Sequence, residues 1–443
     1  MTDTEIDREA WLARKPVRNP EMEQAIFGGD VGEAADLALD EINPLNPHLF
    51  REHRWHDHFA RLRREDPVHF NELGSSGRYW SVTRYDDVRA VDGDWKTYSS
   101  ADGITIGPPV GAPMPASIGS SAASFISMDP PDQTTQRKTV RDISAPGSLR
   151  NLDDLIRDRT IAVLDTLPEG ETFDWVETVS IELTTLLLAT LFDFPLEDRH
   201  KLTRWSDVVT SIPQPGTSIE SGAQQRAEIQ ECLEYFEQLW IEREAKPGFD
   251  LVSMLVHGEA TKGMPAAAHL GNLFLLIVGG NDTTRNSMSG SVFGLNRYPD
   301  QYSKLIAEPS LVENLVPEII RWQTPLSYMR RTATCDTELG GKQIRKDDQV
   351  LMWYLSANRD EEFFGANADA IDLHRENAGR HLSFGYGIHF CMGSRLAELQ
   401  LRILWEEILQ RFDRIEVVGE PERTLSAFIN GYTSLPVQVT RKR

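Results

Sequence analysis

The chain has 443 residues, with 46 lysines and arginines against 68 aspartates and glutamates, so its formal net charge at pH 7 is −22. This excess of negative charge disfavours nucleic acid and anionic lipid surfaces as partners. The three cysteines, Cys232, Cys335 and Cys391, are few and odd in number, which does not indicate a disulfide framework.

The chain begins with a charged segment, MTDTEIDREAWLARKPVRNP, which lacks the apolar core of a signal peptide. No apolar run approaches the roughly 18 residues that a membrane-spanning helix needs. We therefore expect a cytoplasmic protein without a membrane anchor. Residues 1–45 are interpreted as a polar N-terminal leader and residues 46–443 as one large domain.

The periodicity of apolar residues predicts a mainly α fold with a minor β region. After the leader, HFNELG and RYWSVTRYDDV alternate apolar and polar residues as a small antiparallel sheet does. Helical patterns dominate from Ala145 to Glu244, and GGKQIRKDDQVLMWYLSANRD returns to strands.

The run from Gly103 to Met128 contains no charged residue and is rich in glycine, proline and serine. Such a segment is typical of an apolar lid that opens for a ligand. A disordered loop without a role in binding is the alternative.

One long helix is predicted from about residue 265 to 296, since Pro265 suits a first helical turn and Pro299 lies beyond the end. At 1.5 Å per residue this helix would span roughly 48 Å. Gly279 and Gly280 lie inside it, where each costs roughly 1 kcal/mol relative to alanine. We expect a functional reason for this pair, with a simple helix kink as the alternative.

Glu318 and Arg321, in the run PEIIRW, are three residues apart and therefore lie on one helix face, where they can pair. Taken alone, they would be interpreted as a surface ion pair that contributes little. The pair supports a functional role only in combination with other motifs.

The run FGYGIHFCMG, residues 384–393, places Cys391 at the end of a glycine-rich loop. The following SRLAELQLRILWEEILQRF has helical spacing, so this cysteine lies just before or at a helix N-terminus. The helix dipole and free N–H groups there favour a thiolate, which is a good axial ligand for haem iron. A buried, inert cysteine is the alternative.

Together with MDPPDQTTQRKTV, residues 128–140, these segments resemble the cytochrome P450 family of haem-thiolate monooxygenases over most of the chain. The resemblance implies the cytochrome P450 fold, haem b (iron protoporphyrin IX), O2 as cosubstrate, and Cys391 as the metal ligand. It also implies electrons from NAD(P)H through a ferredoxin reductase and a 2Fe-2S ferredoxin. The ferredoxin is expected to dock on a basic patch formed by Arg137, Lys138, Arg141, Arg395 and Arg402.

The resemblance assigns catalytic and structural roles to matching residues. In the family, a glycine pair followed by an acid and an alcohol forms the oxygen-binding groove, and the acid relays protons from solvent. The matching residues here are Gly279, Gly280, Asp282 and Thr283. In the family, an ion pair and a third charged partner brace the loop under the haem. The matching residues here are Glu318 and Arg321, with Arg375 as the third partner by position.

The resemblance also implies contacts to the haem propionates. Arg137 and Arg331 fit this role because guanidinium pairs well with carboxylate, and His381 fits by position. Gln133 stands where many bacterial members have histidine, which departs from the family pattern. The cysteine loop adds the cofactor contacts Phe384, Gly385 and Gly393.

Residues at the family's pocket positions are apolar, which favours a hydrocarbon over a sugar or nucleotide. They are Ile104, Ile106, Phe125, Leu275, Val278, Leu326, Met329, Phe428 and Ile429. GGNDTTRNSMSG and TPLSYMRRTAT resemble the bacterial branch that hydroxylates medium-chain alkanes and fatty acids at the terminal (omega) methyl. A sterol or terpenoid hydroxylase, a non-catalytic haem-thiolate sensor and a peroxide-driven haem enzyme are the alternatives.

Overall fold

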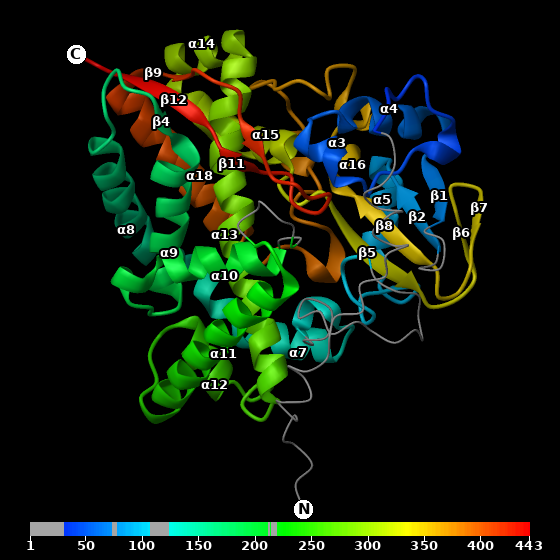
Figure 1. Ribbon diagram of the computed structural model, residues 1–443, viewed down its shortest axis with the longest axis horizontal. Helices are drawn as coiled ribbons and strands as arrows, with labels where there is room; N and C mark the ends of the chain where they lie inside the picture. Colours follow the sequence, from blue (N-terminus) through cyan, green and yellow to red (C-terminus); the bar gives the residue numbers. More distant parts are fainter. Residues whose placement is uncertain (1–30, 73–77, 107–123, 211–212, 214–218) are drawn as a thin grey trace, which may run out of the picture.

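The computed structural model describes residues 31–72, 78–106, 124–210, 213 and 219–443. Most of the longer helices gather on one side of the molecule, and the sheet that contains β1, β2, β5 and β8 lies on the other side together with α3, α4 and α5 (Figure 1). The longest helix of the described chain, α13 (Ala266–Arg297), runs through the middle, one residue from its predicted bounds at either end. The mainly helical fold class with a minor β region is therefore confirmed.

The elements follow one another along the chain from α3 to β12. The helices besides α13 are α3 (Pro47–Arg51), α4 (Trp55–Glu65), α5 (Tyr85–Gly93), α7 (Asp132–Thr139), α8 (Pro146–Asp165), α9 (Glu182–Leu191), α10 (His200–Thr210), α11 (Gly222–Ala245), α12 (Leu251–His257), α14 (Pro299–Ala307), α15 (Val312–Gln323), α16 (Tyr354–Ala357), α17 (Glu361–Phe364) and α18 (Ser394–Arg411). The strands are β1 (Val68–Glu72), β2 (Arg78–Val82), β3 (Tyr98–Ser99), β4 (Phe173–Asp174), β5 (Tyr328–Ala333), β6 (Thr337–Leu339), β7 (Lys342–Ile344), β8 (Gln349–Trp353), β9 (Phe412–Val417), β10 (Glu422–Arg423), β11 (Tyr432–Ser434) and β12 (Pro436–Arg441).

The largest sheet has the strand order β1-β2-β8-β5-β3. β1 and β2 pair antiparallel with Phe70 opposite Trp80, as the alternating sequence predicts. The prediction is wrong for the end of RYWSVTRYDDV, where α5 begins at Tyr85 with two acidic residues in its first turn. β5 runs antiparallel to β8 and carries Arg330 and Arg331 side by side. Because successive side chains of a strand point to opposite faces, these two arginines are directed to different parts of the molecule.

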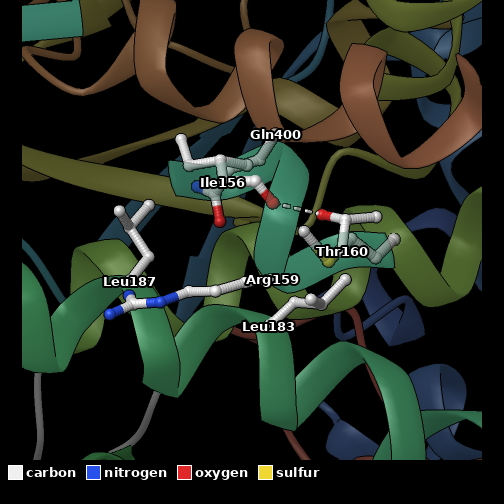
Figure 2. A pocket seen from close by; sticks show the side chains of 7 residues that line it. Ile156, Arg159, Thr160, Leu183, Leu187 and Gln400 are labelled. Carbon is white, nitrogen blue, oxygen red and sulfur yellow. Dashed lines mark hydrogen bonds between the residues drawn. The ribbon is translucent and has the colours of Figure 1, made fainter. Parts of the chain in front are cut away.

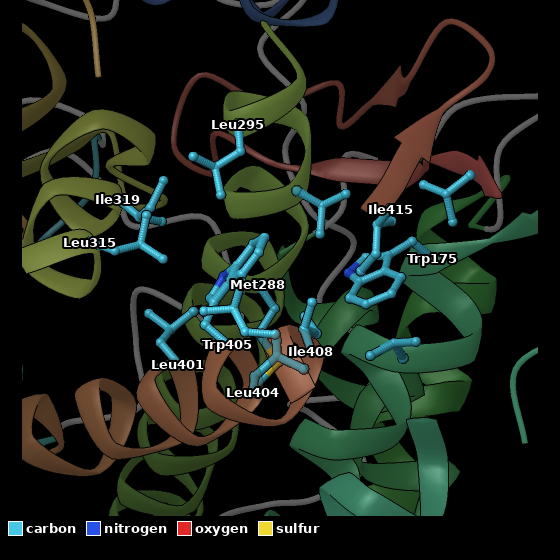
Figure 3. Packing of buried hydrophobic residues seen from close by; sticks show 14 of the residues in the cluster. Trp175, Met288, Leu295, Leu315, Ile319, Leu401, Leu404, Trp405, Ile408 and Ile415 are labelled. Atoms are coloured by element: carbon cyan, nitrogen blue, oxygen red, sulfur yellow. The ribbon is translucent and has the colours of Figure 1, made fainter. Parts of the chain in front are cut away.

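A large apolar core fixes the helix that follows the cysteine loop. Leu401, Leu404, Trp405 and Ile408 recur at helical spacing along α18 and are buried against α13 and α15 (Figure 3). The Trp405 indole N–H also donates a hydrogen bond to Ser291 Oγ of α13 at 2.9 Å. This packing holds the start of α18 in a fixed position beside α13.

The N-terminal region joins the fold before residue 46. Ile42 and Leu45 are 1% and 2% exposed and pack in one cluster with Phe50, Trp55 and other residues under the sheet. Residues 1–30 lie outside the described residues, and the division between a leader of 1–45 and a domain of 46–443 stays a prediction. Among the described helices, none combines the length and apolar character needed to cross a membrane.

Candidate functional site

The cysteine loop is closed by its own backbone. The Cys391 N–H donates a hydrogen bond to the Phe384 carbonyl at 2.7 Å, and α18 begins three residues later. Gly385 and Gly387 have φ values of +69° and +68°, a region that favours glycine. A β-carbon on Gly393 would lie 4.0 Å from Cys391 Sγ, so this glycine leaves room beside the sulfur.

Burial and the start of α18 have opposite effects on the Cys391 thiol. Burial raises the pKa of the Cys391 thiol, although the backbone N–H groups of Gly393 and Ser394 and the Arg137 guanidinium act in the opposite direction. The N–H groups at the helix N-terminus therefore favour a thiolate, as the sequence predicts, and desolvation opposes them. A cation bound at the sulfur would supply the missing stabilisation.

Two α7 residues predicted to contact the cofactor hold the cysteine loop. The buried Gln133 donates from Nε2 to the Ile388 carbonyl at 2.9 Å, and Arg137 donates from Nη2 to the Phe390 carbonyl. The structure thus gives both residues a role in holding the loop backbone. The propionate contact of Arg137 and the cofactor contact of Gln133 stay predictions.

The two adjacent arginines of β5 have separate partners. Arg330 donates to the backbone carbonyls of Asp102 and Gly103 and to Gln349 Oε1, so it anchors the start of the predicted lid. Arg331 donates from Nη2 to Asp92 Oδ1 at 2.7 Å, and both side chains are almost fully buried.

Asp92 was missed by sequence reasoning. This carboxylate lies near the end of α5 and also accepts hydrogen bonds from the Tyr354 hydroxyl and the Tyr386 N–H, each at 2.8 Å. It belongs to no motif and is one of several acids in a polar helix, so the sequence offers no signal for it.

The glycine pair of α13 has two different environments. An added β-carbon on Gly279 would meet no atom within 4 Å, so open space lies beside it. A β-carbon on Gly280 would come within 2.7 Å of Leu188 Cδ2, which shows that Gly280 permits close packing of α9. The Thr283 hydroxyl donates to the Gly279 carbonyl at 2.8 Å, the local bond expected of a helical threonine.

Asp282 faces α10 through an ion-pair network. Its carboxylate accepts a hydrogen bond from Arg285 at 2.8 Å, and Arg285 also donates to Asp207 at 2.9 Å. The Asp282 side chain is 1% exposed and that of Asp207 is 43% exposed. Burial raises the pKa of Asp282 to about 6, partly offset by the Arg285 charge. The network therefore connects a buried acid to the protein surface.

Glu318, Arg321 and Arg375 form a buried three-way ion pair. Arg321 donates to both Glu318 oxygens at 2.7 Å, and Arg375 donates from Nε to the same carboxylate at 3.1 and 3.2 Å. The side chains of Glu318 and Arg321 are 0% exposed, so the surface ion pair considered from the isolated motif is excluded. Arg321 also donates to the carbonyls of Asn358, Ala368 and Ala370, which ties α15 to the segment before the cysteine loop.

The predicted pocket residues fall into two groups. The first surrounds the start of β5, where Leu326 and Ile429 form an antiparallel bridge and the Arg330 N–H donates to the Ile104 carbonyl at 2.7 Å. The remaining members of this group are Ile106, Met329 and Phe428. The second group, on or beside α13, consists of Phe125, Leu275 and Val278. Most of the predicted lid, residues 107–123, lies outside the described residues.

Phe125 is one of the buried members of the predicted pocket. It is 4% exposed within an apolar cluster, and its N–H donates to Asn272 Oδ1 of α13 at 3.0 Å. This residue therefore fills the core where the second half of the predicted lid meets α13.

A small cavity lies among α8, α9, α13 and α18 (Figure 2). Its volume of about 10 Å³ leaves room for roughly one water molecule. It is lined by Ile156, Arg159, Thr160, Leu183, Leu187, Met288 and Gln400, none of which is a predicted site residue. This cavity is therefore not the predicted substrate pocket.

Known proteins resemble the chain along most of its length. The sequence profile of the cytochrome P450 family matches residues 216–430. Linalool 8-monooxygenase from Pseudomonas putida is 36% identical, with 90% of this chain and 98% of the relative covered. A methyl-branched lipid omega-hydroxylase from Mycobacterium bovis is 32% identical, with 86% and 90% covered. The solved structure of CYP153D17 from a Sphingomonas species is 46% identical, with a TM-score of 0.80 and 89% and 98% covered.

The chain belongs to the cytochrome P450 family. It is accordingly a monooxygenase of the cytochrome P450 fold. This confirms the family and the enzyme class that the sequence motifs predict. Haem and O2 are the cofactor and cosubstrate that membership of this family implies.

Three observations fit the presence of haem. Cys391 offers a sulfur beside a glycine, and Gly279 has open space beside it. His381 is buried, with an Nδ1 atom that has no hydrogen-bond partner among the described residues. Burial and the Arg321 charge lower the pKa of His381 to about 3, which favours a neutral ring with one N–H donor. Such a donor suits a haem carboxylate.

Proposed function

We propose that this monooxygenase hydroxylates the terminal carbon of medium-chain alkanes or fatty acids, and that Cys391 would hold its haem iron through the thiolate sulfur. The observation that carries the haem-thiolate part is the cysteine loop, closed at Phe384 and seated at the start of α18. When bound, haem supplies the oxygen-activating chemistry. His381 and Arg331 would hold its propionates, and Phe384, Gly385 and Gly393 would form the wall around the sulfur.

Protons for the reaction are proposed to reach the site along α13. Asp207 is partly exposed, Arg285 bridges it to Asp282, and the raised pKa of Asp282 lets this acid gain and lose a proton near neutral pH. Thr283, the next residue, lies on the part of α13 that carries Gly279. We therefore assign proton delivery to Asp282 and the final positioning of the proton to Thr283.

The substrate proposal draws on the apolar residues around β5 and α13. An omega-hydroxylase among the relatives supports attack on a terminal carbon. The relative named for linalool favours the alternative, a terpenoid hydroxylase. Both candidates need an apolar pocket, so the pocket residues alone do not separate them.

Electrons are proposed to come from NAD(P)H through a ferredoxin reductase and a 2Fe-2S ferredoxin. An open groove of about 830 Å³, lined by Arg150, Arg395 and Glu398 among other residues, lies at the start of α18 and suits a partner surface. Arg402 is paired with Asp153 and Glu406, so it adds less free positive charge to the basic patch than the sequence suggested. We also propose a cytoplasmic location, which agrees with the presence of three cysteines that form no disulfide.

The first test is the absorption spectrum of the purified, reduced protein under carbon monoxide. The wild type should show the spectrum of thiolate ligation, Cys391→Ser should lose it, and Cys335→Ser, which changes an exposed cysteine, should keep it. An imidazole-type spectrum in the wild type would reject the assignment of Cys391.

The second test identifies the substrate. Octane, dodecanoic acid, linalool and a sterol are titrated while the haem spectrum is followed for loss of the iron-bound water, and the products are then identified. A terminal alcohol from octane or dodecanoic acid supports the proposal. Turnover of linalool or the sterol alone would replace it with the alternative.

A further inference from the structure

Asp92 lies where four parts of the fold converge. It comes from α5, its partner Arg331 from β5 and Tyr354 from the start of α16, while Tyr386 belongs to the cysteine loop. The carboxylate is 1% exposed and accepts three hydrogen bonds of 2.7 to 2.8 Å. Both carboxylate oxygens thus accept hydrogen bonds while almost fully shielded from solvent.

The cysteine loop is shaped to lie against this part of α5. A β-carbon on Gly387 would come within 2.9 Å of the Asp92 carbonyl oxygen, and one on Gly385 would lie 3.3 Å from the Asp92 carboxylate. Both glycines also have positive φ. The loop backbone therefore approaches Asp92 as closely as glycine allows.

A second contact from α5 holds the same loop residue. Arg89 donates to the Tyr386 hydroxyl at 3.1 Å, and its guanidinium lies 4.8 Å from the centre of the Tyr386 ring. α5 thus binds Tyr386 through its side chain as well as its N–H. Because the Cys391 N–H is bonded to the Phe384 carbonyl, fixing Tyr386 constrains the loop that presents the sulfur.

The ion pair of Asp92 and Arg331 is buried on both sides. The two side chains are 1% and 3% exposed, and removing one partner would leave the other charge buried without compensation. In the proposed function Arg331 also faces a haem propionate. Its charge is then shared between two carboxylates, one from the cofactor and one from the protein.

We propose that Asp92 is a positioning residue that fixes the cysteine loop through the Tyr386 N–H and balances the charge of Arg331 beside the haem. This inference rests on the proposed haem-thiolate function. Reduction adds an electron to the haem, so a nearby negative charge disfavours the reduced form. Asp92 therefore lowers the reduction potential and keeps the sulfur in place.

The test compares Asp92→Asn with Asp86→Asn, which removes a charge from an exposed position of the same helix. An asparagine amide cannot accept from all three donors, because its NH2 group would oppose one of them. We expect Asp92→Asn to have a more positive reduction potential than the wild type and a larger fraction of the carbon monoxide complex without the thiolate spectrum. Asp86→Asn should match the wild type in both measurements.

The outcomes separate this inference from the proposed function. A normal wild-type spectrum with equal potentials for Asp92→Asn and Asp86→Asn would overturn this inference alone, whereas a wild type without thiolate ligation would overturn the function and the inference together. If Asp92→Asn retains no haem, the double variant Asp92→Asn with Arg331→Gln is compared with Arg331→Gln alone. Both variants lack the propionate partner, and we expect similar haem contents because no lone charge is left in the double variant. Failure of the double variant, with Arg331→Gln alone retaining haem, would also contradict the proposed charge balance.

Discussion

Asp282 and Thr283 are neighbours in the sequence, but α13 gives them different partners. Asp282 is directed to Arg285 and α10, whereas the Thr283 hydroxyl bonds to the Gly279 carbonyl of its own helix. In the proposed function, a proton that enters through Asp207 passes from the side of α13 that carries Asp282 to the side that carries Thr283. The proposed division of work between the two residues rests on this geometry.

Replacing Thr283 by alanine should separate oxygen consumption from product formation. The variant loses the hydroxyl that positions the proton, so NADH and O2 should still be consumed while alcohol per NADH falls by roughly 100-fold, the lower end of what a positioned proton-transfer group contributes. Peroxide should rise in place of alcohol. The measurement is the ratio of alcohol and peroxide to NADH.

The matched control for this experiment is Thr284→Ala, which removes the hydroxyl of the next residue of α13, a buried one. Its alcohol yield should stay close to that of the wild type. Equal yields from Thr283→Ala and the wild type would remove Thr283 from the proposed role.

Within α13, the two central glycines serve different needs. Gly279 has open space beside it, and Gly280 has the Leu188 side chain. Alanine is favoured over glycine inside a helix by about 1 kcal/mol. The surroundings of each glycine decide whether that gain is realised.

Gly279→Ala should stabilise the protein by up to about 1 kcal/mol, yet weaken carbon monoxide binding, because the methyl group enters the open space. Gly280→Ala should gain less stability, because Leu188 must move, and should affect carbon monoxide binding less. Thermal unfolding and carbon monoxide titration of both variants are the measurements. Stronger interference with binding by Gly280→Ala would contradict the assignment.

The ion pair between Glu318 and Arg321 of α15 is buried, so removal of one partner should cost much stability. Glu318→Gln leaves Arg321 and Arg375 without a carboxylate, so the free energy of unfolding should fall by about 3–5 kcal/mol. Urea denaturation measures this loss. The control, Glu313→Gln, changes an exposed acid of the same helix and should alter stability by less than about 0.5 kcal/mol; similar losses for the two variants would contradict the structural role.

At the scale of the whole molecule, partly buried histidines make stability depend on pH. Burial, with a further effect of the Arg359 charge, lowers the pKa of His56 to about 4. His53, which lies edge-on to His56, has its pKa lowered by burial and by nearby arginines such as Arg423. The unfolded chain therefore binds protons at these residues under conditions where the folded protein does not.

The protein should lose stability as pH falls from about 6.5 towards 4. In this window His56 is protonated in the unfolded chain but neutral in the folded one. Each unit of difference between its folded and unfolded pKa values lowers the free energy of unfolding by roughly 1.4 kcal/mol once the pH is below both values. Urea denaturation between about pH 7.5 and 4.5 measures the slope. His56→Gln should reduce it relative to His374→Gln, which changes an exposed histidine, and equal slopes would contradict this account.

Local patterns in the sequence were sufficient for the elements and for the family. The bounds of α13, the antiparallel pair of β1 and β2, and the cysteine ahead of α18 follow from periodicity, prolines and glycines, all of which act over a few residues. The resemblance to cytochromes P450 rested on the same short motifs. The sequence by itself therefore determined the fold class and the cysteine that marks the site.

Only the tertiary structure decided which charges and side chains meet. Asp92 and Arg331 are 239 residues apart in the sequence, and no short pattern connects them. The upward shift of the Cys391 pKa, the burial of Glu318 and the contact of Gly280 with Leu188 likewise depend on what distant segments place around each group. Desolvation and close packing are properties of the folded surroundings, so they could not be predicted from the order of residues alone.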